Sequence, residues 1–324
     1  MTAPDPLVLD TSDLAPLRDP VLLVALTGLF DVAGVSTTAL EHIATADVAG
    51  RDRSLIVGEI DPDPFYDFTV ERPTVEIVER DDGEPERVVT WPGNILRVVR
   101  TGATRDIVAL SGVEPHLRWT TYVRCIMAVI RELEVTQVVT LGSTADVVPH
   151  TRMPVVVGST TDRSLASKLA LAPPTYQGVT GLVGVLHSEL ERVGIPSVSL
   201  RVGVPHYLAM GEHPRAITSL VLHTSHVIGI PLPIDVRESI ARWDEAHSAS
   251  IADDEKLRRY VEVLEAEYDR RAEAAVTSAD DLAASFEAYL RNDSAAKGDH
   301  PASGPHVDDH ESPAADDDDE DAGA

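Results

Sequence analysis

The sequence has few of the residues on which several classes of protein depend. Its single cysteine, Cys125, has no partner for an internal disulfide, and a thiolate metal cluster needs several cysteines. Aromatic residues make up 4% of the chain, too few for a stacking surface that binds single-stranded nucleic acid. The longest mostly apolar run, Val21 to Phe30, is about half the length that a membrane-spanning helix needs. The first residues also lack the basic start and apolar stretch of a signal peptide. We therefore expect a protein of the reducing cytoplasm.

Basic charge is scarce as well. The chain has 27 basic and 54 acidic residues, which gives a formal net charge of −27, and only three of the basic residues are lysines. Residues 293–324 contain eleven acidic residues and one lysine, so most of the negative charge lies in the rest of the chain. A body with this charge repels polyanions. We expect no nucleic-acid partner and no membrane partner.

The first 233 residues alternate short β-branched runs with helical patterns. Runs of successive apolar residues, as in Val21–Thr27 and Gln137–Leu141, are typical of strands buried on both faces of a parallel sheet. The alternation predicts an α/β core domain over residues 1–233, with three αβα layers and a mostly parallel sheet. The other expected strands are Ser54–Glu59, Ile95–Arg100, Asp106–Leu110, Val155–Gly158 and Ser197–Val202, and the expected helices are Thr37–Ala46, Trp119–Leu133, Gly181–Val193 and Pro214–Ile228.

Two further segments differ from this pattern. Thr74–Val78 and Arg87–Trp91 flank an Asp-Asp-Gly turn, which predicts a β-hairpin at an edge of the sheet or projecting from it. Residues 292–324 are rich in Gly, Pro, Ser, His and acids, and such a segment buries too little apolar area to order its backbone. We expect a disordered acidic tail, whose removal should leave the folded body intact.

The stretch between the core and the tail predicts a helical arm over residues 234–291. Candidate helices cover Asp235–His247, Ala252–Ala275 and 278–290. In the second of these, Leu257, Val261, Leu264 and Tyr268 are spaced 4, 3 and 4 residues apart, so they lie on one face of the helix. An apolar seam of this kind needs a covering partner. We expect the arm to pack on the body or between subunits.

Four loops follow predicted strands and carry the candidate binding residues. Ligands of open parallel sheets bind beyond the carboxyl ends of the strands, which here are loops 28–34, 111–119, 142–152 and 204–207. Arg152 is the strongest single candidate, because a guanidinium can hold an anion through two contacts. An equal alternative is that Arg152 pairs with Asp146 or Glu114 and ties two loops together. The polar side chains of these loops define a candidate cleft that consists of Asp31, Glu114, Arg118, Asp146, His150, Arg152 and His206.

Known catalytic patterns are incomplete in this sequence. Loop 28–34 has neither the spacing of a dinucleotide-binding loop nor that of a P-loop. Ser111 or Ser143, with His150 or His206 and Asp146, supplies the residue types of a triad, but Ser111 lacks the GxSxG of a nucleophile elbow. His223 and His226 share a helix face without the carboxylate of an HExxH metal motif. The sequence therefore assigns no catalytic residue, no cofactor and no metal.

A set of short motifs, in order along residues 20–248, gives the sequence a family resemblance. The chain resembles the bacterial, actinobacterial type of the proteasome assembly chaperone 2 family. Each motif is weak alone, and their order and spacing together make the resemblance specific. The motifs are Ala25-Leu-Thr-Gly-Leu-Phe-Asp-Val-Ala-Gly34, Leu110-Ser-Gly-Val-Glu-Pro115, Thr140-Leu-Gly142, Pro149-His-Thr-Arg152, Tyr176-Gln-Gly-Val-Thr-Gly181, Gly194-Ile-Pro196 and Val204-Pro-His-Tyr207.

The resemblance carries expectations about fold and function. It implies a core similar to nucleoside phosphorylases and hydrolases, and a homo-oligomer such as a trimer. Eukaryotic members help to build the proteasome α-ring, and some end in a hydrophobic-Tyr-any motif that this sequence, ending Asp321-Ala-Gly-Ala324, lacks. The resemblance implies no established reaction, and the leading expectation is a protein that acts through protein–protein contacts, with the proteasome as one candidate partner. The alternative is a phosphorylase- or hydrolase-like enzyme, or a small-molecule binder, that uses the candidate cleft.

Overall fold

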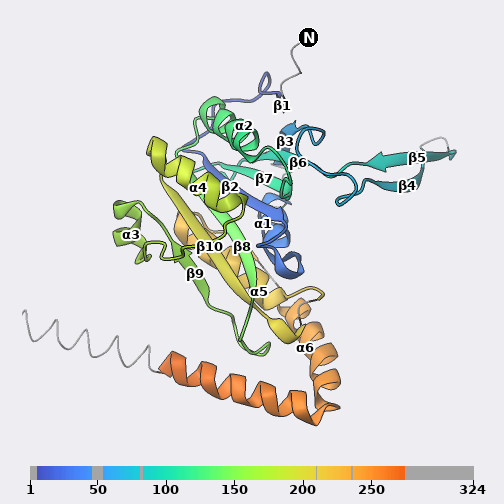
Figure 1. The fold of residues 1–324 in the computed structure, drawn as a ribbon, viewed down its shortest axis with the longest axis vertical. Coiled ribbons are helices and arrows are strands. Elements are labelled where there is room, and N and C mark those ends of the chain that lie inside the picture. The colour runs from blue at the N-terminus through green and yellow to red at the C-terminus, as the bar shows by residue number, and fades with distance from the viewer. Residues whose placement is uncertain (1–5, 46–53, 81–82, 209, 235, 274–324) are drawn as a thin grey trace, which may run out of the picture. The chain divides into compact units, whose positions relative to one another are not determined.

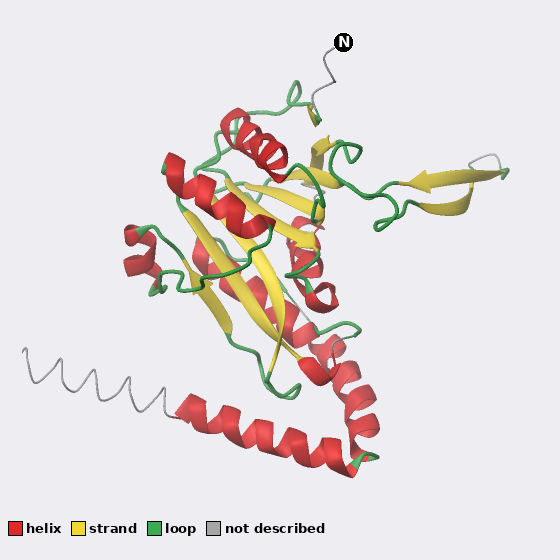
Figure 2. Ribbon diagram, in the orientation of Figure 1, coloured by secondary structure: helices red, strands yellow, loops and turns green. Residues whose placement is uncertain are grey.

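A central sheet dominates the computed structural model, which describes residues 6–45, 54–80, 83–208, 210–234 and 236–273. In the described residues this sheet has eight strands, in the order β1-β3-β6-β7-β2-β8-β10-β9 (Figures 1 and 2). The strands are β1 Leu7–Leu9, β2 Val21–Thr27, β3 Ser54–Ile60, β6 Asn94–Val99, β7 Ile107–Val113, β8 Gln137–Asp146, β9 Val156–Ser159 and β10 Ser197–Pro205.

The centre of the sheet is parallel and its edges are antiparallel. β2 pairs in parallel with β7 on one side and with β8 on the other, and β8 pairs in parallel with β10. At one edge β9 runs antiparallel to β10, and at the other β6, β3 and β1 follow β7 in antiparallel pairs. Each antiparallel step reverses direction, so β3 runs the same way as the four central strands. The predicted mostly parallel α/β sheet is confirmed.

Helices cover both faces of the sheet and complete three layers. Helices α1 (Val35–Thr45) and α5 (Pro214–Ile228) pack on one face, and α2 (Trp119–Glu132) and α4 (Leu182–Val193) belong to the core of the other. Along β2, Leu23 and Ala25 belong to the first core and Leu22 and Val24 to the second, and all four are buried. Burial on both faces is the physical reason why this strand is apolar at successive positions.

Strands β8 and β10 are longer than the sequence predicted. Their pairing continues to Pro205↔Asp146, whereas β2 pairs with β8 only as far as Thr140. Residues 142–146, which were interpreted as loop, are therefore strand. A ribbon of two strands extends beyond the rest of the sheet, and polar side chains are tolerated there because the ribbon is partly exposed to water. The short helix α3 (Arg163–Leu169) was also missed, although Asp162 caps it by accepting a hydrogen bond from the N–H of Leu165 at 2.8 Å.

The predicted hairpin is present as a separate two-stranded sheet. Strand β4 (Thr74–Glu79) pairs with β5 (Pro85–Thr90) and with no strand of the central sheet in the described part of the chain. Figure 1 shows the hairpin extending away from the layered body. Its side chains are exposed or half-buried throughout, so water contacts both of its faces.

The C-terminal part of the described chain is helical. Helix α6 (Arg237–Ala252) is followed by a helix over residues 255–273, in agreement with the first two predicted arm helices. Residues Met1–Tyr268 belong to one compact unit, and Val261 and Leu264 of the predicted seam are buried within it. The predicted helix 278–290 and the acidic tail lie outside the described residues. None of the described helices combines the length and the apolar character that crossing a bilayer requires.

Candidate functional site

Asp31 stabilises the first turn of α1. Its Oδ1 accepts hydrogen bonds from the N–H of Ser36 at 2.8 Å and from the Ser36 hydroxyl at 2.6 Å. Its Oδ2 accepts a further hydrogen bond from the Thr37 hydroxyl at 2.5 Å. The carboxylate is buried and satisfies helix N–H groups that have no partner within the helix. These contacts give Asp31 a structural role at the entrance of α1.

Glu114 joins two loops at the carboxyl edge of the sheet. Its Oε1 accepts a hydrogen bond from the N–H of Leu182, the first residue of α4, at 2.8 Å, and its Oε2 accepts one from the N–H of Leu29 at 3.3 Å. Gly28 allows this approach, because a Cβ at that position would lie 2.7 Å from Oε2 and the φ of +149° favours glycine. Glu114 therefore caps α4 and fixes the loop after β2.

Asp146 and His206 lie at the end of the β8–β10 ribbon. Nδ1 of His206 is 3.0 Å from the main-chain oxygen of Asp146, and Nε2 of His206 is 3.3 Å from the hydroxyl of Tyr260 in helix 255–273. Asp31 forms a bridge with Ser143 of β8, and Asp146 lies three residues further along that strand, roughly 10 Å away. The structure thus places Asp146 and His206 at the ribbon, beyond the loops that Asp31 and Glu114 fix.

His150 and Arg152 lie in the loop between β8 and β9, and both contact groups from distant parts of the chain. The Tyr207 hydroxyl is 2.8 Å from Nδ1 of His150 and 2.9 Å from its backbone N. Nη1 of Arg152 is 3.5 Å from Oε1 of Glu265, which also accepts a hydrogen bond from the Thr151 hydroxyl. The sequence offered an ion pair of Arg152 with Asp146 or Glu114 as one of two equal alternatives. In the structure Arg152 pairs with Glu265 of helix 255–273, a partner that the loop sequences gave no means to find.

The last predicted residue, Arg118, lies apart from these contacts. It precedes α2 in a left-handed conformation, with φ +54°, and its side chain is exposed. Its carbonyl accepts hydrogen bonds from the N–H groups of Thr121 and Tyr122 in the first turn of α2. The contacts of the seven predicted residues therefore divide them among the α1 and α4 entrances, the start of α2, and the β8–β10 ribbon.

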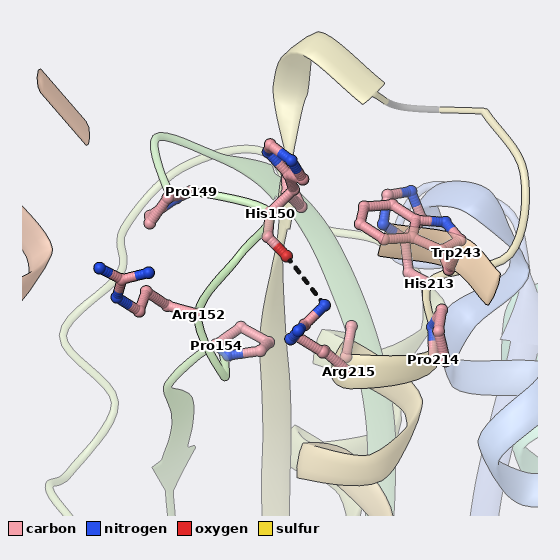
Figure 3. A pocket seen from close by; sticks show the side chains of 10 residues that line it. Pro149, His150, Arg152, Pro154, His213, Pro214, Arg215 and Trp243 are labelled. Atoms are coloured by element: carbon pink, nitrogen blue, oxygen red, sulfur yellow. Dashed lines mark hydrogen bonds between the residues drawn. The ribbon is translucent and has the colours of Figure 1, made fainter. Parts of the chain in front are cut away.

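The cavity beside His150 is almost filled by the chain's own side chains. Figure 3 shows Arg152 and Trp243 on opposite sides of His150, whose carbonyl accepts a hydrogen bond of 3.5 Å from Arg215. The cavity has a volume of about 10 Å³, close to the space that one water needs. Burial lowers the pKa of His150 below its usual value, despite the opposing charges of Glu265 and Asp244. A neutral imidazole in a filled space is suited to packing α6 and helix 255–273 against the ribbon.

A second cavity, of about 320 Å³, lies on the α4 face of the sheet, and the sequence analysis did not single out its polar residues. Its wall includes Ser199 and Arg201 of β10, Thr140 of β8 and His187 of α4. The signal was present in β10, where Ser197, Ser199 and Arg201 alternate with the buried Val198, Leu200 and Val202. Alternation of this kind indicates that one face of β10 is polar, and only the fold shows that a cavity covers it.

The comparisons with known proteins agree with this architecture. The chain has three α/β layers, and the family model of the PAC2 family matches its residues 25–249. A PAC2 family protein from Streptomyces avermitilis is 33% identical, with 75% of this chain and 100% of that chain covered and a TM-score of 0.66. The chain therefore belongs to the PAC2 family, as its motifs predicted.

Two further solved structures are similar. A proteasome-assembly chaperone homologue from Mycobacterium tuberculosis is 32% identical, with 74% of this chain and 99% of that chain covered and a TM-score of 0.65. A protein of unknown function from Corynebacterium glutamicum is 21% identical, covers 83% of this chain and 98% of its own, and has a TM-score of 0.70, which shows a shared fold. No curated protein matches the chain.

Proposed function

We propose that this protein acts by binding other protein chains and that its partner belongs to the proteasome system. Membership of the PAC2 family supports this proposal, as does the similarity to the proteasome-assembly chaperone homologue of Mycobacterium tuberculosis. We also propose that it acts in the cytoplasm as a homo-oligomer, for which native mass spectrometry tests the expected trimer. The observation that carries the proposal is the projecting β4–β5 hairpin.

One face of the hairpin carries three exposed apolar side chains, with Arg87 opposite the central one, Ile77. The other face carries the less exposed Val78 and Val88. Val75 pairs with Val89, and Ile77 follows on the same face because side chains two residues apart in a strand point the same way. The exposed fractions of these three side chains are 48%, 44% and 76%. Exposed apolar patches with polar surroundings mark surfaces that bind another protein. The patch of Val75, Ile77 and Val89 is therefore the proposed docking face.

The hairpin also lacks the support that an isolated two-stranded sheet needs. Such a sheet is at best marginally stable in water, and further strands or a packed helix usually stabilise it. Here an ion pair of 2.8 Å between Arg80 and Glu86 joins the two strands near the turn, and Phe68 packs edge-on against Trp91 at the base, with ring centres 5.0 Å apart. A partner that covers the apolar face would supply the missing burial.

Mixing experiments with purified proteins test the proposal. The protein is combined with the 20S proteasome α subunits of the same organism, and native mass spectrometry measures the complexes that form. Ile77→Asp should abolish the complex, since it places a charge at the centre of the docking face. Thr90→Asp places the same charge on the opposite face of the hairpin and should leave the complex intact. Failure of the native protein to bind, or normal binding by Ile77→Asp, would contradict the proposal.

The alternative, an enzyme that uses the candidate cleft, has less support. Of its seven residues, Asp31 and Glu114 cap helices, and Arg152 pairs with Glu265. The space beside His150 accommodates about one water. A substrate at that place would have to displace helix 255–273, which Tyr260 and Glu265 hold against the ribbon and the following loop, or α6, which Asp244 ties to Arg215 of α5.

A further inference from the structure

We propose that the cavity between α4 and strands β8, β9 and β10 binds a small hydroxylated anion, with Arg201 as the residue that recognises its charged group. Nothing in the family match or in the similar structures assigns this site. The cavity volume of about 320 Å³ lies at the lower end of the range for small-molecule sites. The proposal concerns a different surface from the hairpin and does not depend on the proposed protein partner.

Much of the cavity lining is apolar, but its strand side carries hydroxyl side chains where a sheet covered by a helix ordinarily carries apolar ones. Ser199 of β10 pairs with Thr140 of β8 and with Ser159 of β9, so these three hydroxyl side chains form a row on one face of the sheet. Next to the row, Val24 of β2 pairs with Thr140, faces the same way and belongs to the apolar core. A strand covered by a helix is usually apolar on that face. His187 is the partner of the Thr140 hydroxyl within the chain, and a polar ligand in the cavity would supply partners for Ser199 and Ser159.

His187 fixes one hydroxyl group of the row, that of Thr140, and also the hydroxyl group of Ser197, without adding charge. Its Nε2 lies 2.8 Å from the Thr140 hydroxyl, and its Nδ1 lies 3.0 Å from the Ser197 hydroxyl, so the ring connects α4 to both strands. Burial, with a smaller contribution from the positive charge of Arg201, lowers the pKa of His187 to about 4. The imidazole is neutral at physiological pH. Among the described residues that line the cavity, the positive charge is therefore carried by Arg201.

Arg201 is held in place, and no carboxylate of the described residues pairs with it. Its side chain crosses Gly142 on the neighbouring strand, where a Cβ would lie 3.3 Å from the arginine Cγ, and its guanidinium carbon lies 5.8 Å from the centre of the Phe30 ring. Within the described chain it forms no ion pair, although acidic residues far outnumber basic ones in this protein. A guanidinium has five N–H donors, which suit a carboxylate or a phosphate. An anion in the cavity would be their partner.

The ligand class follows from this arrangement. The anionic group would contact Arg201, and hydroxyl groups of the ligand would contact the row formed by Thr140, Ser199 and Ser159. The described residues contain no group of three or more metal-binding side chains, so the cavity offers no metal centre there. Glu191, also part of the lining, disfavours a second strongly anionic group at its end of the cavity. A sugar phosphate and a sugar acid both fit these requirements.

The test uses the full-length protein and three probes: ribose 5-phosphate, gluconate and uncharged ribose. Isothermal titration calorimetry at constant ionic strength measures binding to the native protein, to Arg201→Gln and to Arg192→Gln. Arg192 lies on α4 with its side chain 69% exposed, so its substitution controls for the loss of one positive charge. We expect at least one anion to bind at millimolar concentration or below, ribose not to bind, and Arg201→Gln to weaken binding about tenfold or more.

The two anions distinguish a phosphate ligand from a carboxylate ligand, and binding of either that depends on Arg201 supports the proposal. The absence of binding by both anions overturns it, as does equal affinity of Arg201→Gln and the native protein. If Arg201→Gln does not fold, Ser199→Leu provides the second variant, because the larger side chain fills the cavity without removing a charge. Unchanged anion affinity in a folded Ser199→Leu variant would likewise overturn the proposal.

Discussion

Arg215 on α5 and Asp244 on α6 form a two-point ion pair, in which Nη2 of the arginine lies 2.7 Å from Oδ2 of the aspartate. The same guanidinium donates a hydrogen bond of 3.5 Å to the carbonyl of His150. One side chain thus connects the core helix α5, the arm helix α6 and the loop between β8 and β9. These contacts fix the first arm helix over the place where the sequence predicted a ligand.

Replacement of Asp244 by asparagine should destabilise the protein. The side chain is 35% exposed and the arginine 18%, so the pair is partly shielded from water, and loss of its charge should cost about 1–2 kcal/mol of unfolding free energy. Urea denaturation measures this change. Glu245→Gln removes the same charge from the exposed neighbouring residue and should have little effect. Equal stabilities of the two variants would show that the pair contributes nothing.

The helix over residues 255–273 offers a matched test of its buried seam. Leu264 is 5% exposed, whereas the adjacent Val263 is 65% exposed. Leu264→Ala should lower the unfolding free energy by about 2–5 kcal/mol, because it removes buried apolar atoms and leaves a cavity. Val263→Ala should change it by less than about 0.5 kcal/mol. Chemical denaturation of both variants is the measurement, and similar losses in the two would mean that Leu264 is not packed in solution.

His187 should make stability depend on pH. Its pKa in the folded protein is about 4, mainly because the ring is buried, and an unfolded histidine has a pKa of about 6.5. Between these values the unfolded chain binds the proton and the folded protein does not, so acid favours unfolding. The contribution is fully present above about pH 6.5 and is lost as the pH falls towards 4, by an amount on the order of 3 kcal/mol.

Comparison of the native protein with His187→Gln isolates this contribution, since other histidines also titrate in that range. The difference in unfolding free energy between the two proteins should be larger at pH 7.5 than at pH 5. In addition, the ring signals of His187 in a two-dimensional NMR spectrum should not titrate between pH 7.5 and 5.5. A midpoint near 6.5 for His187 would show that the ring is exposed to water and would disprove the prediction.

Glu114 should stabilise the start of α4. Glu114→Gln keeps the size of the side chain but removes the negative charge beside the N–H of Leu182, and we expect a loss of about 1 kcal/mol. Glu132→Gln, at an exposed position in the last turn of α2, is the control and should not destabilise the protein. Thermal unfolding gives both values. A Glu114→Gln protein as stable as the native one would exclude the capping role.

Much of the architecture could be predicted because a buried strand or helix requires a recognisable pattern of apolar residues within its own segment. The bounds of β2 were exact, since Val21–Thr27 is apolar at successive positions and lies between helices. The hairpin was predicted from its Asp-Asp-Gly turn. Predictions failed where the determining contact lies on another strand: β8 continues to Asp146 only because β10 pairs with it along its whole length.

The candidate cleft illustrates the same limit. Glu114 and Arg152 were selected for their charge and their position after a strand, which are properties of the local sequence. Their partners, Leu182 and Glu265, lie far along the chain, and no spacing rule connects them. A carboxylate that caps a helix and one that binds a ligand have the same sequence signature, so only the position of the partner distinguishes the two roles.

By itself, the sequence determined the αβα class, the family, the hairpin and the first two arm helices, because each depends on periodicity, turn residues or short motifs within one segment. The tertiary structure alone decided which polar residues face a cavity. His187 and Arg201 come from different elements, and Arg201 crosses Gly142 of a third. A cavity is the space left between packed elements, so its lining depends on how strands and helices are placed in three dimensions, which the order of residues along one segment does not specify.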